Sequence, residues 1–62
     1  MKFISLTKNG TAIALNRDAI AYVTPTSSGT RLYLRETDNE SKMLHLIVSE
    51  PFDVVTAMLN AE

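Results

Sequence analysis

Residues 3–15 read FISLTKNGTAIAL, two alternating segments joined by the pair Asn9-Gly10. An Asn-Gly pair favours a two-residue type I′ turn, because both central residues of that turn need positive φ. With this pair as the loop, Lys8 faces Thr11, and one face of the hairpin collects the large aliphatic residues Ile4, Leu6, Ile13 and Leu15. A shift of one residue would destroy this match, since strand side chains alternate between faces. The stretch therefore predicts an antiparallel β-hairpin with one apolar face.

A third strand is predicted shortly after the hairpin. Residues 15–18 suit a tight turn, because Asn16 and Asp18 accept local backbone hydrogen bonds. The strand then covers residues 19–24, and Pro25 is expected to end it, since proline has no N–H for a strand ladder. Alternation within this strand predicts that Ile20 and Tyr22 share one face and that Val23 lies on the opposite face.

Two strongly alternating segments follow, residues 30–35 and residues 43–48. Both are predicted to be strands, and the polar segment 36–42 between them is expected to be a mobile loop. In the first strand Leu32 and Leu34 point one way. In the second strand one face carries Leu44, Leu46 and Val48, and the other carries Met43, His45 and Ile47.

The C-terminal segment is predicted to be a helix. Ser49 or Glu50 is expected as N-cap, Pro51 fits the first turn, and Asp53 complements the helix dipole. One side of the helix is apolar, with Phe52, Val54, Val55, Met58 and Leu59. The predicted fold class is α+β: a small antiparallel sheet of about five strands, β-β-β-β-β-α, with the helix packed on it. One domain is expected to span residues 1–62.

Composition excludes several kinds of site. The 62 residues include no cysteine and a single histidine, His45. Disulfides, thiolate zinc sites and cysteine nucleophiles are therefore excluded, and His45 has no second histidine or cysteine with which to share a metal. No metal and no cofactor are expected.

The sequence also lacks the motifs that catalysis uses. Ser27-Ser28-Gly29 does not have the Gly-x-Ser-x-Gly pattern of a nucleophile elbow. The acids Glu36, Asp38 and Glu40 alternate without the glycine and terminal glutamate of a calcium loop. Two glycines in the whole chain are too few for a phosphate-binding loop. We therefore expect a binding protein that is not an enzyme.

The apolar segments are too short to cross a membrane, and this bears on the predicted cellular location. The longest wholly apolar run is residues 19–23, whereas a membrane-spanning helix needs about 20 residues. No basic start leads into an apolar stretch, as it does in a signal peptide. We expect a cytoplasmic protein without membrane insertion.

Several short motifs occur in a fixed order along nearly the whole chain: Leu6-Thr7, Asn9-Gly10, Leu15-Asn16, Ile20, and Val48-Ser49-Glu50 running into Val54-Val55. In this order they resemble the FlbD family of small flagellar-operon proteins, of which the swarming-motility protein SwrD is one. Small phage and bacterial proteins of unknown role have a similar pattern. The resemblance implies a cytoplasmic accessory protein without catalytic residues. Two departures stand out: the loop 36–42 replaces a short glycine turn, and Ser49-Glu50-Pro51 replaces the family's Glu-Ser before the helix.

One strand face combines charge with an aromatic ring, through Arg31, Tyr33 and Arg35. Guanidinium groups bind phosphates and a tyrosine ring stacks on a base, so this face is a candidate for contact with RNA or DNA. The net charge of −1, from six Lys/Arg and seven Asp/Glu, is not the basic balance typical of a dedicated nucleic-acid binder. A solvated outer face is the alternative interpretation.

Self-association is the other hypothesis for function. A domain this short buries only about 60% of its unfolded surface, and small domains without disulfides or metals are often stabilised by oligomerisation. Apolar residues outside the predicted core are candidates for a subunit interface, although single surface hydrophobics are normal. The candidate interface residues are Phe3, Val23, Met43, His45 and Ile47. We expect a homo-oligomeric protein-interaction module with an unknown protein partner, and nucleic-acid binding is the alternative.

Overall fold

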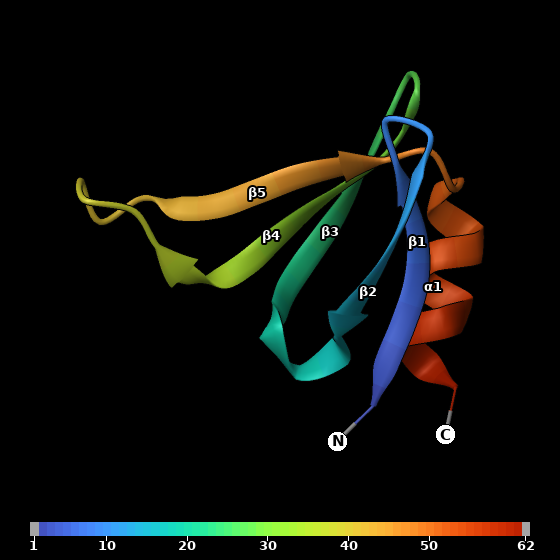
Figure 1. Ribbon diagram of the computed structural model, residues 1–62, viewed down its shortest axis with the longest axis horizontal. Coiled ribbons are helices and arrows are strands. Elements are labelled where there is room, and N and C mark those ends of the chain that lie inside the picture. Colours follow the sequence, from blue (N-terminus) through green and yellow to red (C-terminus); the bar gives the residue numbers. More distant parts are fainter. Residues whose placement is uncertain (1, 62) are drawn as a thin grey trace.

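A computed structural model describes residues 2–61 and confirms the α+β class and the predicted element order. Five antiparallel strands form two sheets, β1-β2 and β3-β4-β5, and one helix follows them (Figure 1). The prediction of one sheet is thus refined to two. The elements are β1 (Phe3–Lys8), β2 (Thr11–Asn16), the 3-10 turn η1 (Arg17–Ala19), β3 (Ile20–Thr26), β4 (Gly29–Thr37), β5 (Met43–Val48) and α1 (Phe52–Asn60).

The β1–β2 hairpin has the predicted register. Lys8 lies opposite Thr11, and Leu6 lies opposite Ile13. Asn9 and Gly10 have φ values of 52° and 78°, as a type I′ turn requires. The side chains of Ile4 and Leu6 on β1 are buried, and those of Ile13 and Leu15 on β2 are half-buried against them. Turn chemistry and apolar pattern therefore specify the same hairpin.

Strand β3 contains a β-bulge that overturns the predicted orientation of its side chains. Ile20 pairs with Leu34 and Tyr22 pairs with Tyr33, so the register shifts at Ala21. Because a bulge adds one residue, it moves the following side chains to the opposite face. Ile20 is consequently buried while Tyr22 is 51% exposed. The expectation that these two residues share a face was wrong.

Pro25 does not end strand β3, contrary to the prediction. It lies within the strand opposite Thr30, and β3 continues to Thr26. β3 pairs with β4 alone, so it is an edge strand. A proline is tolerated there because no further strand on the outer side needs its missing N–H. The loop at this end is correspondingly shorter than predicted, because β4 already begins at Gly29.

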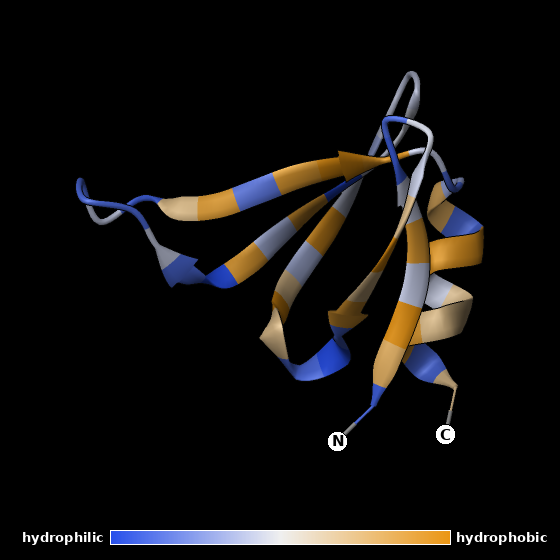
Figure 2. Ribbon diagram, viewed as in Figure 1, coloured by the Kyte–Doolittle hydropathy of each residue, from blue (hydrophilic) through white to orange (hydrophobic). Residues whose placement is uncertain are grey.

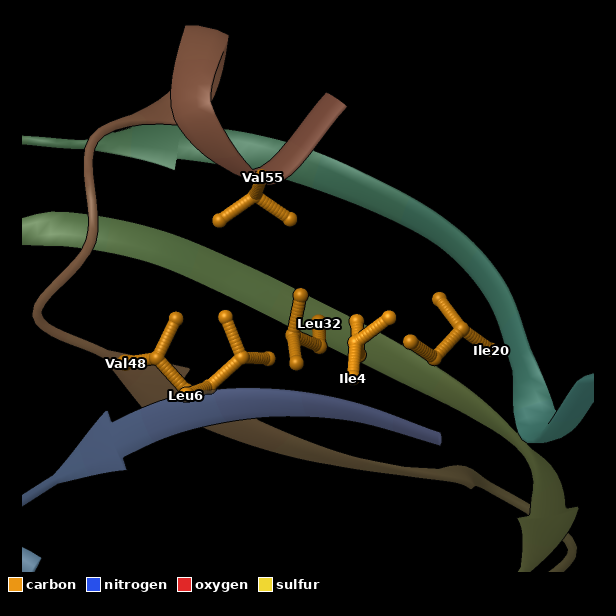
Figure 3. Close-up of a cluster of buried hydrophobic side chains, with 6 residues drawn as sticks. All are labelled: Ile4, Leu6, Ile20, Leu32, Val48 and Val55. Atoms are coloured by element: carbon orange, nitrogen blue, oxygen red, sulfur yellow. The ribbon is translucent and has the colours of Figure 1, made fainter. Parts of the chain in front are cut away.

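The hydrophobic core lies between the two sheets and the helix (Figure 3). Leu6 and Ile4 enter it from β1, and Leu32 lies near its centre on β4. Val55 points into the same cluster from α1. The six buried residues are Ile4, Leu6, Ile20, Leu32, Val48 and Val55.

Helix α1 docks through a narrower stripe than predicted. Val55 is buried, and Met58 and Leu59 pack against the core. Phe52 and Val54 remain 37% and 39% exposed, so only part of the predicted apolar side of the helix packs on the sheets.

The helix also begins differently from the prediction. Pro51 is the N-cap residue and makes no side-chain capping bond, so neither Ser49 nor Glu50 fills that position. Asp53 lies in the first turn as expected and accepts a hydrogen bond from the Val54 N–H at 3.1 Å.

Strands β4 and β5 extend away from the core as a long hairpin arm (Figure 1). β4 runs to Thr37, so the loop at the tip is shorter than the predicted 36–42 segment. Asp38 organises this loop, because its carboxylate accepts hydrogen bonds from the N–H groups of Glu40 and Lys42, at 2.8 and 3.1 Å. Along the inner face of β5, Val48 is buried and Leu44 is 39% exposed, since the arm reaches beyond the core.

Glu50 joins the two sheets where β5 ends. Its carboxylate accepts hydrogen bonds from the Thr7 N–H at 2.9 Å and from the Thr7 hydroxyl at 3.0 Å. The Ser49 N–H donates to the Thr7 carbonyl at 2.8 Å, and the hydroxyl of the buried Thr30 donates to the Glu50 carbonyl at 2.8 Å. These bonds fix the β1–β2 hairpin to the rest of the molecule, so the acid expected as a helix cap instead holds the sheets together.

This junction predicts a pH-dependent stability. The Thr7 N–H lowers the pKa of the Glu50 carboxyl, burial opposes this effect, and the Thr7 hydroxyl lowers the pKa further. A carboxyl group whose pKa is lower in the folded protein than in the unfolded chain stabilises the fold at pH values above its unfolded pKa. This stabilisation is lost as the pH falls through the folded pKa. We expect Glu50→Gln to lower the free energy of unfolding by about 1 kcal/mol at pH 7.

The measurement is urea unfolding of wild type and Glu50→Gln at pH 7 and at about pH 3, below the ordinary pKa of glutamate. The difference between the two proteins isolates Glu50 from the other carboxylates, and it should shrink at the lower pH. A difference that stays the same at both pH values would contradict the proposed junction.

Candidate functional site

The side of the β3-β4-β5 sheet that points away from the core carries both tyrosines, the one histidine and two of the three arginines of the chain. Leu32 faces the core, so its neighbours Arg31 and Tyr33 point to the other side. Cross-strand register then places Tyr22 and His45 beside Tyr33, one on each side. We call this surface the outer face, and define it by Tyr22, Thr24, Arg31, Tyr33, Arg35, Met43, His45 and Ile47.

Three rings form a row across the outer face. The rings of Tyr22 and Tyr33 stack with centroids 4.5 Å apart and planes at 14°. The His45 ring lies 5.9 Å from Tyr33 and is tilted by 41°. Cross-strand aromatic pairs of this kind stabilise a sheet and hold each other's rotamers. The row is therefore a pre-ordered surface, open at its Tyr22 end.

The two arginines of the outer face differ in their hydrogen bonding. Arg35 Nε donates to the Asp18 carbonyl at 2.9 Å, which ties this side chain to η1. Arg31 is half-buried, and within residues 2–61 its buried Nε has no hydrogen-bond partner. Guanidinium nitrogens only donate, and buried donors in native proteins are nearly always paired. Arg31 thus lies on the outer face with a buried donor that no group among residues 2–61 satisfies.

The charge of the outer face differs from that of the chain as a whole. The chain carries a formal charge of −1, but the residues that define the outer face include two arginines and no carboxylate. Glu36 lies on β4, and the other acidic residues of the arm lie in the loop at its tip, where Glu40 forms an exposed ion pair with Lys42 at 3.7 Å. The outer face is therefore locally positive.

Two sets of residues that the sequence kept separate meet on this surface. Arg31, Tyr33 and Arg35, the candidate nucleic-acid contacts, lie on β4. Met43, His45 and Ile47, from the candidate subunit interface, lie beside them on β5. One continuous surface therefore contains both.

Two other candidate interface residues lie elsewhere. Val23 was expected outside the core, but the bulge at Ala21 turns it inward, where it packs against the buried cluster. Phe3 is 61% exposed on β1 and lines a shallow groove with Met58, apart from the outer face.

Sequence reasoning missed Tyr22 as a member of this surface. The run from Ala19 to Val23 is apolar on both faces, so alternation cannot show which residues face the core. Pairing with β4 sets the position of the bulge, and no residue of β3 predicts it locally.

Neither a metal cluster nor a membrane span is found in the described chain. Residues 2–61 bring no three His, Cys, Asp or Glu side chains together in a way that could hold a metal ion. Within the same residues, no helix has the length and apolar character needed to cross a membrane.

The chain matches no family model, no curated protein and no solved structure.

Proposed function

We propose that this chain is a non-enzymatic protein-interaction module whose outer face binds an acidic partner protein. The observation that carries the proposal is the position of Arg31, whose Nε has no partner among residues 2–61, beside a row of stacked rings and among outer-face residues that include no carboxylate. A carboxylate of the partner would accept from the guanidinium group of Arg31 and contact the tyrosines at its side.

The composition of the outer face supports protein binding. Interface cores are enriched in tyrosine, methionine and arginine, and tyrosine and arginine are among the residues that contribute most to affinity. All three types occur here, and no lysine is present. The stacked rings of Tyr22 and Tyr33 are already ordered, so binding orders few additional side chains.

The charge of the outer face argues for a partner other than the same face of a second copy. Two outer faces packed together would bring Arg31 and Arg35 of each copy close to those of the other, and like charges across an interface oppose binding. A partner surface rich in Asp and Glu has the opposite sign and supplies the acceptors that guanidinium groups need.

The resemblance to the FlbD family supports a biological setting for this module. It fits a cytoplasmic accessory factor of a flagellar or phage-related system. The identity of the protein retained by the outer face tests this setting directly.

We expect Arg31→Ala and Tyr33→Ala each to weaken partner binding by about 30-fold, the effect typical of an interface hot spot. Partners captured from the source organism by the immobilised chain are identified, and the affinity of the purified partner is then measured by calorimetry. Lys42→Ala and Phe3→Ala are matched controls, because they remove a cation and an aromatic ring outside the outer face. Binding that is lost in Phe3→Ala and kept in both outer-face variants would overturn the proposal.

Nucleic-acid binding is the second candidate, and the exposed end of the ring row favours it. The 51% exposed ring of Tyr22 offers a face for a base, with arginines on the same surface. Against it, Tyr22 already stacks on one face of Tyr33, and the tilted His45 ring lies 5.9 Å away on the neighbouring strand.

Fluorescence anisotropy with labelled single-stranded RNA and DNA, at low and physiological salt, decides this point. Salt-dependent binding that disappears in the double variant Arg31→Ala/Arg35→Ala would support the second candidate. An unchanged anisotropy at low salt would remove it.

A further inference from the structure

We infer that the free edge of β5 pairs antiparallel with β5 of a second copy of this chain, centred on His45. The pairing joins two three-stranded sheets into one continuous sheet. It provides a surface for the homo-oligomer expected from the size of the domain. The inference goes beyond the proposed function and does not depend on it, because it rests on the backbone edge and the side-chain register of β5 and not on Arg31 and Tyr33 of β4.

The backbone of β5 has an unpaired edge. β5 is the last strand of its sheet and pairs with β4 on one side only. The Ser49 N–H, just after β5, points to the other side and donates to the Thr7 carbonyl. Backbone groups in a strand alternate in direction, so the N–H and C=O groups of Ile47, His45 and Met43 point to this same free edge. Among residues 2–61 no backbone hydrogen bond to this edge precedes Ser49.

Nothing in β5 protects this edge, in contrast to β3. The edge strand β3 carries Pro25 and a bulge, two devices that block strand addition. β5 contains neither proline nor Lys, Arg, Asp or Glu, and it is apolar along its length except at His45 (Figure 2). Leu44 and Ile47 are each 39% exposed. An exposed, apolar and unprotected edge of this kind favours pairing with another strand.

The strand is complementary to itself in one antiparallel register. With His45 opposite His45 of the second copy, Leu44 lies opposite Leu46 and Met43 lies opposite Ile47. The residues whose N–H and C=O groups point outward are then paired with each other, as an antiparallel ladder requires. Apolar side chains meet apolar side chains on both faces, which is the arrangement that stabilises cross-strand neighbours.

β1 approaches this edge at the Val48 end, where the Ser49 N–H donates to the Thr7 carbonyl, so the pairing uses Met43–Ile47. β5 forms the free side of the projecting arm, and the core of the molecule lies at its Val48 end (Figure 1). Antiparallel pairing therefore places the two cores at opposite ends of the joined sheet, with the arms overlapping between them. This geometry gives a closed two-fold dimer, because each copy offers the same edge.

The test exploits the position of His45 on the two-fold axis. His45→Lys and His45→Glu each place like charges opposite one another, and we expect each to weaken dimerisation about tenfold. An equimolar mixture of the two variants places opposite charges there and should recover the dimer. Ala14→Lys is the control, since it adds the same charge on an exposed strand position away from β5. The measurement is light scattering coupled to size exclusion over a dilution series of the full chain.

A wild-type monomer at every concentration would overturn the inference. A dimer that forms equally well in His45→Lys, or a mixture that does not recover it, would overturn the register. These outcomes say nothing against partner binding at Arg31, so the two proposals fail separately.

A second measurement covers the case in which the charged variants do not fold. The chain has no cysteine, so a single His45→Cys substitution introduces the only thiol. Opposed residues of this register lie about 5.5 Å apart at Cα, a separation that suits a disulfide. We expect a cross-linked dimer on mild oxidation, with little cross-linking of Ala14→Cys. Equal cross-linking at both positions would overturn the inference.

Discussion

Replacing Gly29 by alanine is expected to leave most of the protein unfolded. Gly29 has a φ of 154°, and a Cβ atom added there would overlap the carbonyl oxygen of Val48. Because that oxygen belongs to the backbone of β5, the clash is relieved only by moving β4 and β5 apart. We expect a loss of about 3 kcal/mol or more, comparable with the whole stability of a domain of this size.

Gly10→Ala is the matched control for this substitution. Gly10 also has positive φ, at 78°, but a Cβ atom there would meet nothing within 4 Å. Its expected cost is about 1–2 kcal/mol, from the left-handed backbone alone. Urea unfolding followed by circular dichroism measures both variants, and a Gly29→Ala protein as stable as Gly10→Ala would contradict the close approach of Gly29 to Val48.

Truncation of Leu32 to alanine is expected to have the second largest effect. Leu32 is completely buried at the centre of the core, between β1 and α1 (Figure 3). Leucine-to-alanine changes at such sites cost about 2–5 kcal/mol, from lost burial and from the cavity that remains. The same unfolding experiment measures it.

Leu44→Ala provides the comparison, because it removes the same atoms from the same sheet at a position that is 39% exposed. We expect a loss of about 1 kcal/mol or less there. Similar losses at Leu32 and Leu44 would contradict a core centred between the two sheets, because the arm would then contribute as much to stability. A Leu44→Ala protein in which only the dimer is weakened would agree with pairing along β5.

The parts of the fold that could be predicted are those specified by neighbouring residues. In the β1–β2 hairpin, Asn9-Gly10 sets the turn and the apolar residues independently set the same register. β3 lacks such agreement, because its apolar run does not favour one face over the other. There the pairing with β4 decides, and it inserts a bulge that the residues of β3 do not encode locally.

The division into two sheets and the role of Glu50 depend on contacts between distant residues. Glu50 meets Thr7 across 43 positions of the sequence, and no local pattern reports such a contact. An acid just before a predicted helix is typical of an N-cap, so local chemistry favoured the wrong partner. Glu50 accepts hydrogen bonds from Thr7 because the fold brings β1 beside the end of β5.

The outer face shows the same limit for the candidate site. Its arginines and tyrosine on β4 were found because they alternate along one strand. Their contact with β5 depends on the register across the arm, where β4 carries extra residues between Tyr33 and Thr37. Spacing along the sequence cannot fix that register, so the sequence predicted two surfaces where the structure has one.

The two ends of the described chain lie close together, and this has a consequence for how the domain can be combined with others. The Arg17 guanidinium donates to the Ala61 carbonyl at 2.6 Å, and Lys2 Nζ approaches the same oxygen at 3.5 Å (Figure 1). A short linker could therefore bridge the ends, and new ends could be opened at the exposed turn between β3 and β4 to give a circular permutant. By the same geometry, the domain can be inserted into a surface loop of a host protein, with the host chain entering and leaving on the same side of the domain.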